Sequence, residues 1–162
     1  MSVSVRRLGG PQRVAATLRK LALKSGTVKA GVLEAATYPD EPYTDARTGK
    51  QHPDPRAGMH VATIAAALEY GNGQNHPRPF MQQTIAAQRV EWAQKLVKLL
   101  MGGMPSAQAL MTVGQVMKED IQQTITDWPA DNSPEWAAVK GFSHGLIWTS
   151  HLLKSIESEI EK

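Results

Sequence analysis

Hydrophobic residues recur every three or four positions in several stretches of the chain, which is the spacing of one face of an α-helix. A stripe of valine and leucine from Val14 to Leu21 predicts an amphipathic helix over 11–26 whose other faces are basic. The same spacing favours a helix over 59–70 that ends at a glycine. The β-branched residues in this stretch leave a strand over 59–64 as the alternative.

Two longer helices are predicted in the middle of the chain. Apolar periodicity favours one over 81–101, which Gly102-Gly103 ends, and one over 107–127, for which Ser106 is the expected N-cap. Since a short linker joins them, we expect the two helices to pack as an antiparallel pair.

Alternation of apolar and polar residues predicts two strands, one over 27–37 and one over 155–160. The segment 129–147 shows no period and is expected to be irregular. We therefore predict an α+β fold, in which a small antiparallel sheet packs against two long helices and a basic N-terminal helix, with a long projecting loop.

The projecting loop is expected over residues 38–58, which hold four prolines and two glycines without any hydrophobic period. Loops of this length are uncommon in compact domains unless they are functional. We expect it to become ordered on contact with a partner; a disposable surface insertion is the alternative. The chain then divides into a flexible basic arm over 1–10 and a single domain over 11–162.

Positive charge is concentrated towards one end of the chain, although the formal net charge is only +3. Residues 1–30 carry seven basic side chains and no acidic one, whereas residues 59–162 carry eight basic and ten acidic side chains. The basic segment suits a partner that bears phosphate or acidic groups, and the solvated face of an amphipathic helix is the alternative interpretation.

Composition limits the possible chemistry. The chain contains no cysteine, which excludes disulfides and cysteine nucleophiles and favours a reducing compartment. No apolar run approaches the roughly 20 residues of a spanning helix, so we expect a soluble protein without a membrane partner. No two histidines share a helical face, and no phosphate-binding loop occurs. We predict that the protein is not an enzyme and has no metal site or cofactor.

We expect its four tryptophans to anchor the core: Trp92, Trp128, Trp136 and Trp148.

Two segments of the chain carry recognisable motifs. The first is a predicted helix that ends in Glu69-Tyr70-Gly71, followed by a short polar loop and then Pro77-Arg78-Pro79-Phe80. This order resembles that of tail-completion proteins of tailed bacteriophages. In that family, a helix that ends in Glu-(Phe/Tyr)-Gly is followed by a Pro-x-Arg-Pro-Phe type motif and a long helix.

The second segment, residues 140–156, is similar to the closing pattern of the family. That pattern is Lys-Gly, then Pro-Leu-Ile-Asp-Thr-Gly-x-Leu, then Ser-Ile leading into a strand. Gly145, Trp148 and Ser150 stand where the family has proline, aspartate and glycine. The resemblance extends over about residues 28–160, with both motifs in the expected order.

The resemblance implies a structural virion protein at the phage neck or the head-proximal end of the tail. It implies a homo-oligomeric ring of about six subunits that completes the tail and joins it to the head. Its partners would be other neck and tail proteins (tail tube, terminator and connector), and its location the virion, after assembly in the host cytoplasm. A tail terminator subunit, a head-tail connector subunit, a non-specific DNA-binding module and a phage hydrolase are the alternatives.

The residues expected at a subunit or partner interface come from the first motif and the projecting loop: Glu69, Tyr70, Arg78, Phe80, Tyr43 and Arg47. We expect Glu69 and Arg78 to pair across the tight loop and Phe80 to pack under the helix pair. An ion pair that holds its own loop is the alternative role of Arg78. Basic residues before the first strand would line a lumen crossed by packaged DNA, without sequence readout: Arg6, Arg7, Arg13, Lys20 and Lys24.

Overall fold

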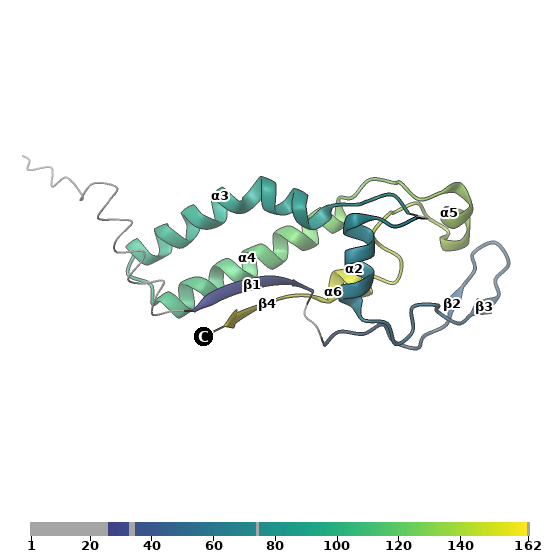
Figure 1. Ribbon diagram of the computed structural model, residues 1–162, viewed down its shortest axis with the longest axis horizontal. Helices are drawn as coiled ribbons and strands as arrows, with labels where there is room; N and C mark the ends of the chain where they lie inside the picture. Colours follow the sequence, from purple (N-terminus) through teal and green to yellow (C-terminus); the bar gives the residue numbers. More distant parts are fainter. Residues whose placement is uncertain (1–25, 33–34, 74, 162) are drawn as a thin grey trace, which may run out of the picture.

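The computed structural model describes residues 26–32, 35–73 and 75–161, and it has the α+β fold predicted from the sequence. The molecule is elongated, with two long helices and a two-stranded sheet at one end and shorter helices and loops at the other (Figure 1). The expected N-terminal arm and basic helix lie outside the described residues, so their predictions stay predictions.

The two long helices are α3 (Phe80–Met101) and α4 (Ser106–Thr126), and they run side by side in opposite directions, as predicted (Figure 1). Gly102 ends α3. The prediction that Ser106 caps α4 is wrong, because Pro105 occupies the N-cap and Ser106 is already helical. The apolar stripe of α4 is buried, whereas Ile85 of α3 is exposed.

The sheet consists of β1 (Thr27–Val32) and β4 (Ile156–Glu161), which pair antiparallel from Thr27 opposite Glu161 to Val32 opposite Ile156. Helix α4 lies between α3 and this sheet and contacts both of its strands (Figure 1). Gly114 allows this close approach, because a Cβ there would lie 2.7 Å from Cγ2 of Val28. Strand β1 ends at residue 32, short of the predicted end at residue 37.

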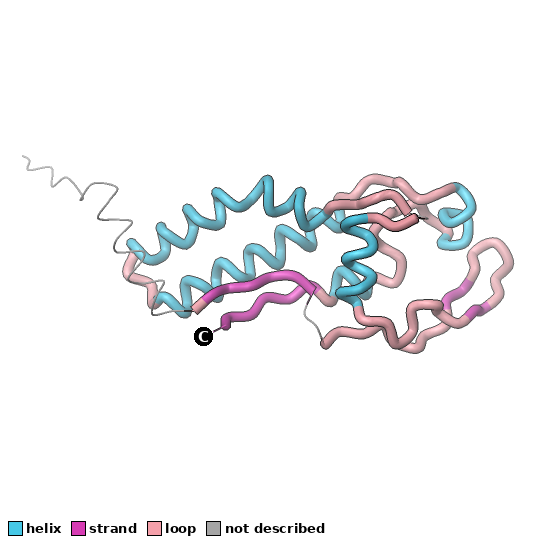
Figure 2. Tube along the Cα trace, viewed as in Figure 1, coloured by secondary structure: helices cyan, strands magenta, loops and turns pink. Residues whose placement is uncertain are grey.

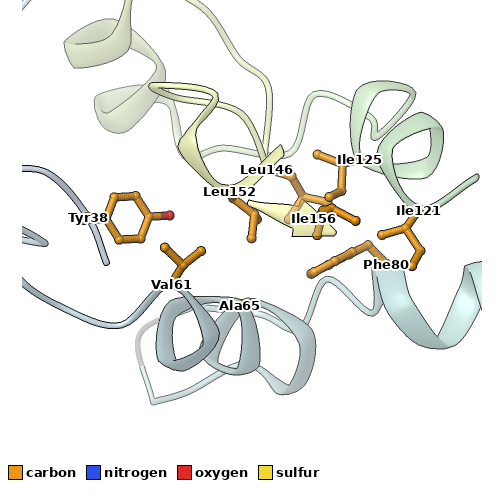
Figure 3. Close-up of a cluster of buried hydrophobic side chains, with 9 residues drawn as sticks. All are labelled: Tyr38, Val61, Ala65, Phe80, Ile121, Ile125, Leu146, Leu152 and Ile156. Atoms are coloured by element: carbon orange, nitrogen blue, oxygen red, sulfur yellow. The ribbon is translucent and has the colours of Figure 1, made fainter. Parts of the chain in front are cut away.

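The main core lies where helix α2 (Val61–Tyr70) meets the end of the sheet and the second half of α4 (Figure 3). The helix predicted over 59–70 is thus confirmed, and the strand alternative is excluded. A short helix, α6 (His151–Lys154), adds one buried leucine. The buried hydrophobic residues of this core are Tyr38, Val61, Ala65, Phe80, Ile121, Ile125, Leu146, Leu152 and Ile156.

The predicted loop over 38–58 contains regular structure. Two-residue strands β2 (Tyr43–Thr44) and β3 (Gln51–His52) pair antiparallel, and the hairpin projects at the end of the molecule away from the sheet (Figure 2). Segment 129–147, predicted to be irregular, contains helix α5 (Pro134–Lys140). These elements are too short to produce a hydrophobic period, which explains why the sequence pattern missed them.

Candidate functional site

The first motif forms a tight connection between α2 and α3. Gly71 ends α2 with a φ of 73°, and a Cβ at this position would lie 2.9 Å from the backbone of both Asn75 and Pro77. The backbone N–H of Arg78 donates to the carbonyl of Leu68 at 2.6 Å, which brings the loop back against the helix it has just left. Glycine is therefore required at position 71 both for its conformation and for space.

Glu69 caps helix α3 from the neighbouring helix. Its carboxylate is buried and accepts the backbone N–H groups of Met81 and Gln82, both at 2.9 Å. These N–H groups belong to the first turn of α3, where no partner exists within the helix, and Pro79 at the N-cap provides no side-chain cap. A negative charge is also favourable at this end of the helix dipole.

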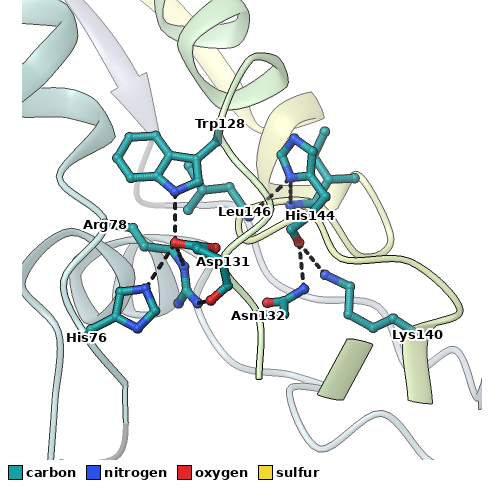
Figure 4. Close-up of polar contacts among 9 residues, drawn as sticks. His76, Arg78, Trp128, Asp131, Asn132, Lys140, His144 and Leu146 are labelled. Carbon is teal, nitrogen blue, oxygen red and sulfur yellow. Dashed lines mark hydrogen bonds and ion pairs between the residues drawn. The ribbon is translucent and has the colours of Figure 1, made fainter. Parts of the chain in front are cut away.

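The expected pairing of Glu69 with Arg78 is wrong, because each side chain has another partner. The Arg78 guanidinium is buried and donates through Nε to Oδ2 of Asp131 at 2.8 Å and through a terminal nitrogen to the Asp131 carbonyl at 3.3 Å (Figure 4). Arg78 therefore forms an ion pair within the subunit, but the pair joins the loop to Asp131, far along the chain, whereas the alternative prediction had it hold its own loop. Both carboxylate oxygens of Glu69 accept hydrogen bonds from α3, and Arg78 pairs with Asp131 instead.

Asp131 is the centre of a polar cluster. Besides Arg78, its Oδ2 accepts hydrogen bonds from Nε2 of His76 at 3.0 Å and from the indole of Trp128 at 3.1 Å (Figure 4). Burial alone would raise the pKa of the Asp131 carboxyl, but the hydrogen bonds from His76, Trp128 and Arg78 outweigh burial and hold this pKa below its usual value. The carboxylate therefore remains charged at neutral pH.

The second motif closes over the same carboxylate. A Cβ at Gly145 would lie 1.7 Å from Oδ1 of Asp131 and 2.8 Å from Nε of Arg78, so the backbone at this position packs directly on the ion pair. Oδ1 is buried there without a hydrogen-bond partner among the described residues. The two motif segments, far apart in sequence, thus meet at Asp131.

Lys140 and His144 fix the chain that leads to Gly145. The Lys140 ammonium and the Asn132 amide both donate to the His144 carbonyl. Burial, together with the nearby positive charges of Arg78 and Arg56, lowers the pKa of Lys140 to about 8 against the opposing effect of Asp131. The second motif thus contains a buried lysine whose charge the surroundings disfavour.

The His144 imidazole acts as a turn-forming side chain. Its Nδ1 accepts the backbone N–H groups of Leu146 and Ile147, at 3.3 and 3.0 Å (Figure 4). Since Nδ1 is an acceptor, the proton lies on Nε2, which donates to the Thr126 carbonyl at 3.0 Å. Both ring nitrogens of His144 therefore form hydrogen bonds with backbone groups, which gives the imidazole a structural role.

The projecting hairpin is held by a second group of interactions. Asp54 binds Arg56 through two side-chain bonds, at 2.6 and 2.9 Å, and the Arg56 guanidinium lies between the rings of Tyr38 and Trp148, at 4.4 and 4.2 Å. Tyr43 packs against the same Trp148 ring at 4.8 Å. All of these contacts lie within one chain.

The residues predicted for an interface fall into two groups. Glu69, Arg78 and Phe80 are buried and hold their own subunit together, and Phe80 lies in the core as expected. Tyr70, with 72% of its surface exposed, lies beside them on α2. Tyr43 and Arg47 belong to the hairpin, where Arg47 is exposed and pairs with Asp45. The predicted lumen residues Arg6, Arg7, Arg13, Lys20 and Lys24 lie outside the described residues.

The four tryptophans do not share one environment, so the expectation that all anchor the core is only partly right. Trp92 is buried and donates to Asp120 at 2.6 Å, whereas Trp136 is exposed and packs edge-on against the half-buried Trp148.

The sequence analysis did not identify three charged residues of the site: Asp131, Asp54 and Arg56. A repeated Asp-x-Arg pattern, at 45–47 and 54–56, was the available signal for the hairpin ion pairs, because both triplets form the same local turn.

Comparison of the chain with protein-family models, with curated proteins and with solved structures gives no match. Within residues 26–32, 35–73 and 75–161, no group of three or more His, Asp or Glu side chains is arranged to hold a metal ion. None of the helices in this part of the chain is both long enough and apolar enough to cross a membrane.

Proposed function

We propose that this chain is a structural protein of a tailed-phage virion, which acts at the neck or the head-proximal end of the tail. It would form a ring, of about six copies, that completes the tail and joins it to the head. The observation that carries the proposal is the meeting of the two motif segments at the Arg78–Asp131 ion pair, with Gly145 packed against it. Both segments that carry the resemblance therefore serve one structural purpose.

A second observation supports the same interpretation. Ser150 has a φ of 58° and is the one residue other than glycine with a positive φ in the described chain. The tail-completion pattern has glycine at the corresponding position, and glycine adopts this conformation without strain. The backbone thus has the conformation that the family's glycine favours, although the side chain differs.

The chemistry of the site agrees with a structural role. Glu69, Arg78, Asp131 and His144 all have partners within the subunit, and these partners are mainly backbone groups and each other. Interfaces would then use side chains that remain exposed near the site and on the hairpin. Tyr70 and Arg47 are the predicted residues that meet this condition, and Tyr43 on the hairpin is half-buried.

The test measures the mass of the purified chain by multi-angle light scattering, alone and after mixing with tails assembled in cells that lack this chain. A closed ring of about six copies, or a smaller species that binds the end of such tails, is expected. A species that ignores the tails would overturn the neck assignment. A Tyr70→Ala variant, matched with exposed Met111→Ala on α4, should bind tails at least tenfold more weakly than its control.

A non-specific DNA-binding module is the second candidate, because residues 1–30 carry seven basic side chains and no acidic one. In this case the isolated chain would bind duplex DNA, and the affinity would fall steeply between about 50 and 200 mM salt. A variant with glutamine at Arg6, Arg7, Arg13, Lys20 and Lys24 would lose this binding. Tail capture by that variant at the level of the unmodified chain would separate the two functions.

A further inference from the structure

Helix α3 has an apolar stripe on the side that is turned away from α4. Val90, Ala93, Val97 and Met101 follow one another at spacings of three and four residues, so they lie on one face of the helix. The buried Trp92 lies on the opposite side, where its indole donates to α4. Since α3 packs mainly against α4 (Figure 1), Val90 and Met101 remain 58% and 60% exposed.

A groove of about 750 Å³ runs along this outer stripe. Besides the four apolar residues of the stripe, its lining consists of Arg89, Gln94 and Lys98, and it includes no acidic residue. At 100° of rotation per residue, Arg89 and Lys98 lie on opposite sides of the stripe, about 13 Å apart along the helix axis. Neither forms an ion pair with a described residue. The stripe thus presents apolar surface between two uncompensated positive charges.

The shape of the stripe suits another helix. The small Ala93 lies between Val90 and Val97, so the backbone of a partner helix can approach closely and its side chains can enter the spaces between the valines. Helices bind in such grooves through apolar residues at the same three- and four-residue spacing. Helices that lie on lipid surfaces insert tryptophan, phenylalanine or leucine, and the lining of this groove contains none of these.

The charges exclude this chain as the occupant. Residues 1–30 carry seven basic side chains and no acidic one, so they would place like charges beside Arg89 and Lys98. Two copies of α3 packed antiparallel, with Val90 opposite Val97, would place Arg89 opposite Lys98. Parallel packing would leave both cations without an acidic partner. Among the other described helices, none has more than one exposed large hydrophobic side chain, so none offers a matching stripe.

We propose that the outer stripe of α3 binds an amphipathic helix of a different protein, one that is apolar along one face and carries aspartate or glutamate on both sides of that face. Val90 and Val97 pack against its apolar residues, and Arg89 and Lys98 pair with its carboxylates. The inference goes beyond the proposed function, because the stripe belongs to α3 alone and requires neither a ring nor a tail.

The test uses two fluorescein-labelled helical peptides of three heptads, both with leucine at positions a and d. One peptide has glutamate at positions e and g, and the other has lysine there. Fluorescence anisotropy measures their binding to the full chain at about 50 and about 500 mM salt. The glutamate peptide should bind at least tenfold more tightly than the lysine peptide at low salt, with a smaller ratio at high salt. Val90→Asp should weaken the glutamate peptide at least tenfold.

Ile85→Asp is the matched control, because Ile85 is an apolar residue of α3 that is 45% exposed and lies away from the stripe. It should bind the glutamate peptide as tightly as the unmodified chain does. A variant with both Arg89→Glu and Lys98→Glu should instead prefer the lysine peptide. All of these variants keep the basic residues of segment 1–30, so attraction of the peptide to that segment would not follow this pattern.

Equal binding of the two peptides would overturn the inference, as would a glutamate peptide whose affinity is unchanged by Val90→Asp. A dimer that Val90→Asp dissociates, seen by light scattering, would assign the stripe to a second copy. Vesicles of anionic lipid that bind the unmodified chain but not Val90→Asp would assign it to a lipid surface. Tail capture decides the proposed function separately, since a chain that ignores tails and binds the glutamate peptide would refute only the neck assignment.

Discussion

A single methyl group at position 145 would collide with the Asp131 carboxylate, because a Cβ there lies 1.7 Å from Oδ1. We predict that Gly145→Ala lowers the free energy of unfolding by about 2–4 kcal/mol, the range of severe overpacking beside a buried polar group. Urea unfolding followed by circular dichroism measures this loss. Gly73→Ala is the matched control, since nothing lies within 4 Å of its added Cβ. Equal losses in the two variants would contradict the role of the Asp131 contact.

Ser150 has the left-handed backbone conformation that side chains disfavour. We predict that Ser150→Gly raises the free energy of unfolding by up to about 1 kcal/mol, because relief of strain exceeds the entropy that glycine adds to the unfolded chain. Thermal unfolding at fixed pH measures the gain. Thr149→Gly, at the preceding exposed position, should instead be neutral or destabilising, and a gain of the same size there would argue against relief of strain.

Lys140 makes stability depend on pH in the alkaline range. Its pKa is about 8 in the folded chain, against an ordinary value of 10.5, so between these two values the unfolded chain binds more protons. Stability therefore rises with pH across this window, by no more than about 3 kcal/mol from this group. Below pH 8 Lys140 is charged in both the folded and the unfolded chain, so its burial lowers the free energy of unfolding by the full amount.

The measurement compares urea unfolding of the unmodified chain and of Lys140→Met at pH 7.5, 9 and 10.5. The free energy of unfolding of the unmodified chain should rise relative to that of the variant as pH increases. The difference between the proteins removes the contributions of other titrating groups, such as tyrosines. Parallel curves for the two proteins would show that Lys140 has its ordinary pKa.

At the scale of secondary-structure elements, Glu69 fastens the end of α2 to the start of α3. We predict that Glu69→Ala lowers the free energy of unfolding by about 2–3 kcal/mol, because two N–H groups in the first turn of α3 lose a charged acceptor. Hydrogen exchange of the Met81 and Gln82 amides should become faster by at least tenfold. Glu91→Ala is the matched control: Glu91 is exposed on α3, the helix of the two amides, and its substitution should leave both unchanged.

Helix α4 and the sheet meet at Gly114, where a Cβ would lie 2.7 Å from Val28 and 3.3 Å from Ser158. Alanine is the better helix former by about 1 kcal/mol, yet we predict that Gly114→Ala is destabilising by about 1–2 kcal/mol because the sheet has to move away. In a Val28→Ala background, the same substitution should become neutral or stabilising. Chemical unfolding of the four proteins in this cycle decides the question, and an unchanged loss in that background would exclude Val28 as the cause.

Elements were predictable from the sequence where they are long. The periodicity of α3 and α4 extends over several turns, so their existence and pairing followed from it, with boundaries wrong by a residue. Helix α5 has a local sequence signal, since Ser133 caps it and Pro134 occupies its first turn. Hydrophobic periodicity does not report such a signal. The strands of the hairpin, at two residues each, are held by ion pairs and aromatic packing that a hydrophobic pattern does not report.

At the scale of the whole molecule, the site depends on contacts between residues far apart in sequence. Arg78 was selected from its motif, but its partner Asp131 lies 53 residues away, in a segment without a period. Local spacing cannot identify such a partner, so the nearest carboxylate, Glu69, was the wrong choice. The two motif segments do meet in the structure, because Gly145 of the second packs on the ion pair of the first.

The pairing of β1 with β4 also sets the order in which a subunit becomes ready for use. β1 is synthesised early, yet its partner consists of residues 156–161, so the ribosome must make nearly the whole described chain before the sheet can form. Closing so long a loop is slow compared with forming the helices. A chain that has not yet reached residue 156 therefore cannot form the β1–β4 sheet. The side of α4 that this sheet covers stays without its partner until residues 156–161 have been made.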